Sequence, residues 1–235
     1  MFTNAPKIQV VKIEDHSFYS PQIIHSGVVL DLGANKGNFS KYLISNFGVT
    51  CYAVELEEYL VREYLENTPG LCAVNIAISA TRGEISVNRS DDHCSTILDS
   101  RLHKNSEELV QSGTYQDLIE RIGRDSFDLV KIDIEGSEVQ LFATCSDAEI
   151  LKWKQITIEF HDFIFPEISH EVHFIRKRLR RLGFIEIKFS LDNTDILYLN
   201  QNYIKLNKFS LARIKFRFKY MTGLKRLIVR NFYSK

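Results

Sequence analysis

The sequence lacks the signals of a membrane-spanning or secreted protein. No stretch of its 235 residues approaches the roughly 18 consecutive apolar residues that a membrane-spanning helix needs. Residues 1–12 contain no basic start followed by an apolar core, so we expect no secretory signal. No two of the four cysteines form a Cys-x-x-Cys pair, and Cys51 and Cys72 are most simply buried thiols. These absences favour the reducing cytoplasm.

Acidic residues are absent from residues 201–235, which contain ten lysines and arginines. The whole chain has 30 basic and 30 acidic residues, so the first 200 residues hold 20 basic against 30 acidic ones. An acidic body with a basic tail is an interaction signal. Residues 214–220 alternate apolar and basic side chains, which suits an anionic membrane surface or a partner enzyme. A segment that simply covers the fold is the alternative, and attachment would make the protein peripheral to the membrane.

The strongest signal in the chain is a glycine turn after an apolar strand. Residues 28–32 have the composition of a buried parallel strand, and Gly33 and Gly37 allow a tight turn without a Cβ. Residues 39–47 then show the one-sided apolar spacing of a helix that ends at Gly48. This unit is typical of a nucleotide-binding α/β fold, with the ligand at the carboxyl end of the strand.

The spacing of the turn indicates the kind of ligand. A dinucleotide site would show Gly-x-Gly-x-x-Gly, whereas here Asp31 ends the strand and Gly33 and Gly37 follow. A carboxylate suits a cationic ligand such as S-adenosylmethionine, which carries an ammonium and a sulfonium and no phosphate. Glu55 ends the next apolar segment about 20 residues later, where doubly wound folds bind a ribose. Together these residues predict an adenosine-containing ligand.

A later strand carries two acids to the same edge of the sheet. Residues 127–132 lead into Asp133 and Glu135, and a helix is predicted to follow from Gly136 to about residue 144. Alternation along an extended backbone would place both carboxylates on one side. Paired acids at the ligand-bearing edge are costly unless they bind something.

The following strand, residues 155–160, ends in Glu159 and His161. We hypothesise that His161 removes the proton of an acceptor hydroxyl and is oriented by Glu159 or Asp133. In the alternative, Asp133, Glu159 and His161 hold a divalent metal that lowers the pKa of the acceptor. Both hypotheses remain open at this point.

The rest of the chain is expected to complete one α/β domain. We expect an N-terminal cap at residues 1–27 with a strand at 8–13, a binding domain at 28–200 and a basic aromatic tail at 201–235. Within the binding domain, further strands are expected at 71–78 and 83–87, and helices at 57–66, 115–122 and 169–182. A polar loop at 88–106 and a hairpin at 184–199 complete it. Phe174, Ile175, Leu179 and Leu182 should form the inner face of the last helix, and residues 176–181 a solvated basic face.

These segments resemble the FkbM-type S-adenosylmethionine-dependent methyltransferases. The likeness is carried by residues 30–39, 52–55, 75–79, 129–138 and 158–161. Its most specific part is Lys-Ile-Asp-Ile-Glu-Gly-x-Glu at residues 131–138. The resemblance implies a Rossmann-like class I fold, a seven-stranded mostly parallel sheet with an antiparallel last hairpin and helices on both faces. It also implies O-methylation, commonly of a hydroxyl on a sugar, polyketide or similar molecule.

The same resemblance implies roles for individual residues. The methionine part of the cofactor would lie against Asp31, Gly33, Asn35 and Gly37, and Ala34 and Asn38 of the same segment would also bind the cofactor. Glu55 would bind the ribose, and Leu56 stands where the family often has a proline. Asn75, unless it only caps a turn, would lie with Ala77 near the adenine, and Asp133 near the transferring methyl group.

Three other classes share parts of this pattern. A nicotinamide dehydrogenase would have the turn and the later acid, but the third glycine is absent. A nucleic-acid base methyltransferase usually shows Asn/Asp-Pro-Pro-aromatic after the fourth strand, and no two of the four prolines are adjacent, so we do not expect nucleic acid as a partner. A non-catalytic cofactor-binding protein stays open. The expected partner is a small-molecule or glycan acceptor.

Overall fold

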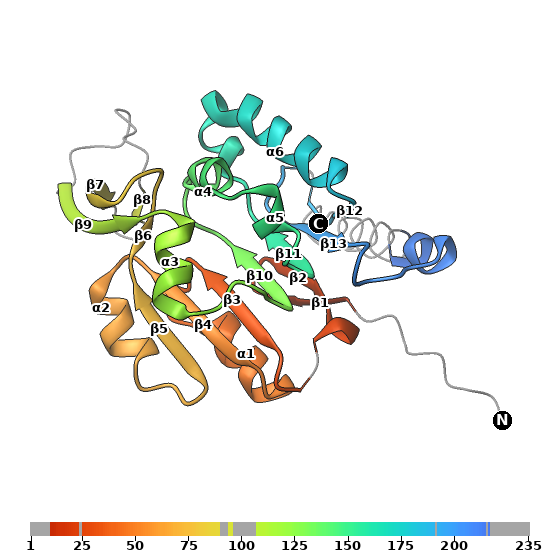
Figure 1. Ribbon diagram of the computed structural model, residues 1–235, viewed down its shortest axis with the longest axis horizontal. Helices are drawn as coiled ribbons and strands as arrows, with labels where there is room; N and C mark the ends of the chain where they lie inside the picture. Colours follow the sequence, from red (N-terminus) through yellow and green to blue (C-terminus); the bar gives the residue numbers. More distant parts are fainter. Residues whose placement is uncertain are drawn as a thin grey trace, which may run out of the picture.

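The computed structural model describes residues 10–23, 25–89, 94–95, 107–190, 192–214 and 216. Its centre is a seven-stranded sheet in the order β12-β13-β11-β10-β3-β4-β5 (Figure 1). The strands are β3 (Val28–Leu32), β4 (Thr50–Glu55), β5 (Leu71–Asn75), β10 (Leu129–Ile132), β11 (Gln155–Ile158), β12 (Phe184–Lys188) and β13 (Ile196–Asn200). Strand β13 is antiparallel to both neighbours, and the other pairings of this sheet are parallel. The expected sheet with its antiparallel last hairpin is confirmed.

The strand order reverses between β3 and β10. The chain runs outward from β3 through β4 to β5 and then returns to β10 on the other side of β3. In open α/β sheets, ligands bind outside the carboxyl ends of the strands at such a reversal. The register pairs Asp31 with Lys131, so the turns that follow these two strands lie side by side.

Both faces of the central strands are covered, because their side chains alternate between two cores. Leu30 and Leu32 face the larger core, to which α3 (Tyr115–Ile122), α4 (Glu138–Thr144) and α6 (Ser169–Arg181) contribute. Val29 faces the opposite core and packs there with Phe39 and Leu43 of α1 (Asn38–Phe47). Burial on both sides explains why these strands are apolar without a polar alternation.

The helix ends follow local signals that are readable in the sequence. Helix α1 begins after Gly37 and ends before Gly48, and both glycines have the left-handed backbone that caps a helix end without a Cβ. Helix α3 begins with a capping box between Thr114 and Asp117. The predicted helix at residues 57–66 is present as α2 (Glu58–Leu60) followed by the π-helical turn η2 (Val61–Leu65).

A second sheet was not expected. Its four strands, in the order β6-β9-β7-β8, are β6 (Ala77–Ile78), β7 (Gly83–Arg89), β8 (Cys94–Ser95) and β9 (Glu107–Gly113). The predicted surface strand at 83–87 is β7, but its partner β9 was missed because Glu107–Gly113 has no alternation of apolar and polar residues. Most of the expected loop at 88–106 lies outside the described residues.

The N-terminal segment is a β-hairpin rather than a single strand. Strand β1 (Val10–Ile13) confirms part of the expected strand, whereas residues 1–9 lie outside the described part of the chain. Strand β2 (His16–Tyr19) was not expected and pairs with β1 in antiparallel fashion. Its Phe18 is fully buried against α1. The hairpin therefore belongs to the folded core.

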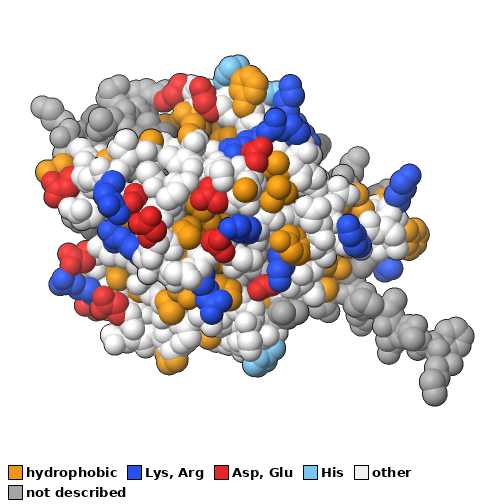
Figure 2. Space-filling model, viewed as in Figure 1, with side chains coloured by type: hydrophobic (Ala, Val, Ile, Leu, Met, Phe, Trp, Pro, Cys, Tyr) orange, Lys and Arg blue, Asp and Glu red, His pale blue; other side chains and the backbone are white. Residues whose placement is uncertain are grey.

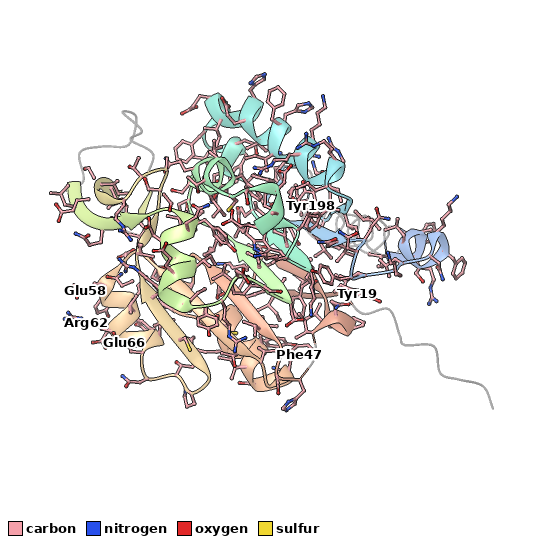
Figure 3. All side chains as sticks on the ribbon, viewed as in Figure 1. Tyr19, Phe47, Glu58, Arg62, Glu66 and Tyr198 are labelled. Atoms are coloured by element: carbon pink, nitrogen blue, oxygen red, sulfur yellow. The ribbon has the colours of Figure 1, made fainter. Side chains whose placement is uncertain are left out.

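Three expectations about side chains were wrong. Cys72 is exposed, because β5 is the edge strand of the sheet. Phe174 is 51% exposed, and Val172 takes the expected place in the inner face of α6. The basic run of α6 is not simply solvated, because Arg176 pairs with Glu186 of β12 at 2.7 Å, and Tyr198 of β13 donates to the same carboxylate at 2.9 Å (Figure 3).

Part of the predicted tail belongs to the fold. Ile204 and Ile214 are buried against Leu197 and Leu199 on the hairpin-side face of β13. The body of the domain therefore extends beyond residue 200, and residues 217–235 lie outside the described chain. Within the described residues, the structure contains no helix with the length and apolarity to cross a membrane.

Candidate functional site

The glycine turn after β3 lies directly against the end of β10. A Cβ on Gly33 would stand 1.7 Å from the carbonyl oxygen of Asp133, and Gly33 has a positive φ of 76°. The backbone N–H groups of Gly33 and Ala34 both donate to the carbonyl of Val54, each at 3.0 Å. The two strand ends approach so closely that only glycine fits, and the two hydrogen bonds to Val54 tie the turn to β4.

A buried lysine lies beneath this turn. The Nζ atom of Lys131 donates to the carbonyl of Gly33 at 2.5 Å and lies 3.3 Å from Asp31. Asp31 is fully buried and also accepts a hydrogen bond from Ser40 at 2.7 Å. Burial opposes the charge of Lys131, but Asp31 and Asp133 raise the pKa of its ammonium above the ordinary value. Asp31 thus stabilises the turn through Lys131, whose ammonium contacts both Asp31 and the carbonyl of Gly33. Its predicted contact with the cofactor stays a prediction.

Glu55, at the end of β4, faces the same turn. Its carboxylate accepts from the backbone N–H of Asn35 at 2.8 Å and of Glu57 at 3.0 Å. Burial raises the pKa of Glu55, partly offset by these hydrogen bonds. The carboxylate is therefore a preorganised acceptor between the glycine turn and the turn after β4, the position at which a ribose is predicted.

Asn75 acts on the turn that holds Glu55. Its amide Nδ2 donates to the carbonyls of Glu55 and Leu56, each at 2.9 Å. The turn-stabilising alternative for Asn75 is thus present in the structure, and Ala77 is buried beside it in β6. Asn38, the first residue of α1, donates to Glu14 of the N-terminal hairpin at 2.8 Å.

Asp133 is the centre of the site. One carboxylate oxygen, Oδ2, lies 3.1 Å from Nε2 of His16 and 3.5 Å from Nζ of Lys131. The other oxygen, Oδ1, lies 3.7 Å from Nε2 of His161. Burial opposes ionisation, but Lys131 and the two histidines hold the pKa of Asp133 well below its usual range. Asp133 is therefore a fixed negative charge.

His161 is buried, and a residue that we did not predict orients it. Its Nδ1 atom lies 2.9 Å from Glu138, which is itself fully buried, and its Nε2 atom lies 3.3 Å from Glu135. Burial lowers the pKa of His161, but Glu138, Glu135 and Asp133 together raise it to about 9. Our expectation that Glu159 or Asp133 orients the ring is corrected to Glu138. The imidazole is protonated at neutral pH in this arrangement.

Glu159 is half-buried and differs from the other acids of the site. Burial and the neighbouring charge of Asp133 raise its pKa to about 7, and the charge of His161 offsets only part of this. A carboxylate with this pKa exchanges protons near neutral pH. Of the three predicted catalytic residues, Glu159 has the pKa best suited to a general base.

Among the residues that the structure describes, two groups of side chains have the spacing of metal ligands. The ligand atoms of His16, Asp133 and Glu159 lie within 4.8 Å of one another, and so do those of Asp133, Glu135 and His161. The predicted trio of Asp133, Glu159 and His161 is thus divided between two overlapping groups. Mixed imidazole and carboxylate sets suit divalent cations such as Mn²⁺ and Zn²⁺.

Sequence reasoning missed His16, Lys131 and Glu138 as members of the site. Lys131 carried a readable signal, a charge inside the otherwise apolar run Leu129–Ile132. Glu138 carried one as well, because it was part of the segment with the most specific resemblance. His16 carried none, since only tertiary packing brings the hairpin to Asp133.

The sequence of the chain matches a known protein family and one curated protein. The family model described as the methyltransferase FkbM domain matches residues 15–186. The AMB antimetabolite synthetase AmbE of Pseudomonas aeruginosa is similar over 169 residues with 27% identity, which covers 71% of this chain and 7% of that protein. The chain thus spans a small part of the length of this curated relative.

Solved structures resemble the chain at low identity. One is a fibrillarin pre-rRNA processing protein of Methanococcus jannaschii, with 12% identity, a TM-score of 0.45 and 84% of each chain covered. Another is a TehB-like SAM-dependent methyltransferase of Corynebacterium glutamicum, with 13% identity, a TM-score of 0.38, and 77% of this chain and 84% of that chain covered.

Proposed function

The chain belongs to the methyltransferase FkbM domain family, and we propose that it transfers a methyl group from S-adenosylmethionine to a hydroxyl of a sugar, a glycan or a related natural product. The family makes it an S-adenosylmethionine-dependent methyltransferase with a Rossmann-like class I fold. The hydroxyl acceptor is our proposal. The observation that carries it is the convergence of Asp133, Glu159 and His161 beside the glycine turn at the strand-order reversal.

The site suits this cofactor on two grounds. The turn that begins at Gly33 lies at the carboxyl end of β3, where the strand order reverses and where open α/β sheets bind their ligands. The carboxylates here are those of Asp31, Asp133, Glu135 and Glu138. They outnumber the positive charges of Lys131 and His161, so the site favours a cation. Bound S-adenosylmethionine supplies an electrophilic methyl group on a sulfonium. Transfer of that methyl group leaves the neutral thioether S-adenosylhomocysteine.

The protein's part in the reaction is to align the acceptor and take its proton. The acceptor oxygen forms the new C–O bond as the C–S bond breaks, and its proton must leave as positive charge develops there. We propose that Glu159 receives this proton at neutral pH, because His161 is already protonated. His161 then serves as a base only at alkaline pH. Alignment supplies up to about 7–11 kcal/mol, and a placed base about 10²–10⁴ in rate.

An exposed apolar pair beside the site supports an acceptor with a ring. Phe163 and Ile164 are 46% and 44% exposed and follow His161 by two and three residues. The ring of Phe163 stacks on that of His161, with centroids 5.9 Å apart and an interplanar angle of 28°. Such a surface suits the C–H face of a sugar, so Phe163→Ala should raise KM for the acceptor more than it changes kcat.

The decisive experiment measures cofactor and acceptor separately. Calorimetric titration with S-adenosylhomocysteine should show binding that Glu55→Ala weakens by at least about 10-fold, while NADH should not bind. Tritiated S-adenosylmethionine should then label hydroxyl groups in a panel of glycosides and glycolipids. Labelling confined to amines or nucleic acid would contradict O-methylation, as would binding of NADH in place of S-adenosylhomocysteine.

A metal-assisted variant of this reaction is the second candidate, favoured by the ligand spacing around Asp133. A divalent cation there would bind the acceptor oxygen and lower its pKa, so that a separate base matters less. Loss of activity in EDTA, restored by Mg²⁺ or Mn²⁺, would select this variant. Full activity in EDTA would eliminate it.

We further propose that the basic residues beyond residue 216 attach the protein to an anionic membrane surface or a partner enzyme in the reducing cytoplasm. Their excess of positive charge supports this. On the face seen in Figure 2, basic and acidic side chains are interspersed, so the body offers no single-sign field there that would suit nucleic acid.

A further inference from the structure

The N-terminal hairpin is hydrogen-bonded to β11 and to the residue that precedes β13. The backbone N–H and the hydroxyl of Ser17 both donate to buried Asp195, at 3.0 and 2.7 Å. Tyr19 exchanges two hydrogen bonds with Gln155 of β11, at 2.9 and 3.2 Å, where the hairpin meets the sheet (Figure 3). These contacts hold β2 against β11 and β13.

The hairpin turn reaches the site at two points. Glu14 accepts a hydrogen bond from Asn38, the residue after Gly37 of the glycine turn. His16 is 2% exposed, and its Nε2 atom lies 3.1 Å from Oδ2 of Asp133. The hairpin thus touches both the cofactor turn and the central carboxylate.

The ring of His16 has little freedom. It packs edge-on against Phe39 of α1, with centroids 5.8 Å apart and an interplanar angle of 78°. Phe18 packs against the ring of Phe39 as well. Because His16 and Lys131 both face Oδ2 of Asp133, the carboxylate cannot rotate without losing them, and Oδ1 stays directed toward His161.

We propose that His16 is a positioning residue: it holds Asp133 in the orientation that the methyl-transfer site requires, so that the N-terminal hairpin contributes this one side chain to the support of that site. The inference rests on the proposed function for its kinetic consequence. Its structural consequence, a fixed Asp133, does not depend on the identity of the acceptor.

The test uses three variants of the full chain. His16→Leu fills the buried position with an apolar side chain and removes the N–H donor that faces Asp133. His16→Gln restores an N–H donor near the position of Nε2. Ser17→Ala is the matched control, because it weakens the hairpin anchor but keeps the backbone N–H bond to Asp195 and leaves His16 intact.

We expect His16→Leu to lower kcat by about 10- to 100-fold, the usual cost of losing a supporting contact to a catalytic group, with KM for S-adenosylmethionine changed less. His16→Gln should recover most of the loss, and Ser17→Ala should lower the melting temperature while kcat stays within about 3-fold of wild type. Equal kcat values in His16→Leu and wild type, or equal losses in the Leu and Gln variants, would overturn the proposal.

Hydrogen exchange gives a readout that needs no acceptor. Relative to Ser17→Ala, His16→Leu should increase amide exchange of the turn at residues 133–138, whereas Ser17→Ala should affect only the hairpin. Unchanged exchange at 133–138 in His16→Leu refutes the positioning role even if methyl transfer is found. Increased exchange with no transfer to any hydroxyl supports positioning and refutes the proposed function instead.

Discussion

At the scale of single residues, the sharpest constraint lies at Gly33, where an added Cβ would meet the backbone of Asp133 at 1.7 Å. Gly123, the C-cap of α3, also has a positive φ, but an added Cβ there has no atom within 4 Å. Both positions carry the cost of a left-handed backbone, about 1–2 kcal/mol for a residue other than glycine. Only Gly33 adds a collision.

Gly33→Ala should therefore damage the protein far more than Gly123→Ala. We expect Gly123→Ala to lower the melting temperature by about 2–8 °C, and Gly33→Ala to exceed this and to abolish measurable binding of S-adenosylhomocysteine. Thermal melts and calorimetric titration of both variants provide the check. Similar melting temperatures and affinities in the two variants would show that the turn adapts.

The pH dependence of the reaction separates the two candidate bases. Glu159 accepts a proton only when ionised, so kcat/KM should rise with pH through about 7, the pKa that burial and Asp133 impose. If His161 were the base, the rise would instead continue to about 9, where its imidazolium loses a proton. Glu159→Gln should remove the lower limb and reduce kcat by about 10²–10⁴-fold. A limb unchanged in Glu159→Gln would exclude Glu159.

At the scale of elements, a contact between Glu138 and His161 links the first turn of α4 to the segment that follows β11. Fully buried Glu138 accepts from the backbone N–H groups of Ile134 and Gly136, each at 3.2 Å, and lies 2.9 Å from His161. Together with Glu135 and Asp133, it outweighs burial and raises the pKa of His161 to about 9. Protonation of His161 therefore stabilises the contact between these two elements.

Stability should consequently fall at alkaline pH. Because the pKa of His161 is raised from 6.5 to about 9 on folding, its contribution is complete below pH 6.5 and is lost as pH rises through about 9. Glu138→Gln should flatten this dependence and lower the melting temperature at neutral pH. Glu149→Gln alters the capping box of α5 (Asp147–Ile150) and the contact with Gln116, neither of which involves His161; it is the control and should keep the slope. Equal slopes in wild type and Glu138→Gln would contradict this coupling.

At the scale of the whole molecule, the basic tail divides into a folded part and a part beyond the described residues. Ile204 and Ile214 are buried against β13, so a chain ending at residue 200 would expose the core that they cover. A chain ending at residue 216 keeps both side chains. The two truncations therefore test different properties.

We expect truncation after residue 216 to reduce cosedimentation with anionic vesicles, because it removes six basic residues and no acidic one. Truncation after residue 200 should lower the melting temperature strongly, because each buried isoleucine contributes about 1.5–3 kcal/mol. Vesicle binding that is equal for the full chain and the chain ending at 216 would remove membrane attachment. Neutral vesicles are the control for charge.

By itself, the sequence determined the class of fold and most of the residues at the carboxyl edge of its central strands. Glycines at 33 and 37 and acids at 31, 55 and 133 are local signals: turns need positive φ, and ligand-bearing residues follow buried strands. The same holds for helix ends at Gly48 and Gly123, where the last turn closes within a few residues of chain.

Only the tertiary structure decided which groups hold these acids in place. His16 meets Asp133 across 117 positions of sequence, Lys131 reaches under a turn 98 positions earlier, and Glu138, not Glu159, orients His161. Such partners are selected by packing and by the cost of leaving buried charges unpaired, and neither leaves a periodic trace in the chain. For the same reason, the pairing of β7 with β9 and the burial of Ile204 and Ile214 could not be predicted from composition.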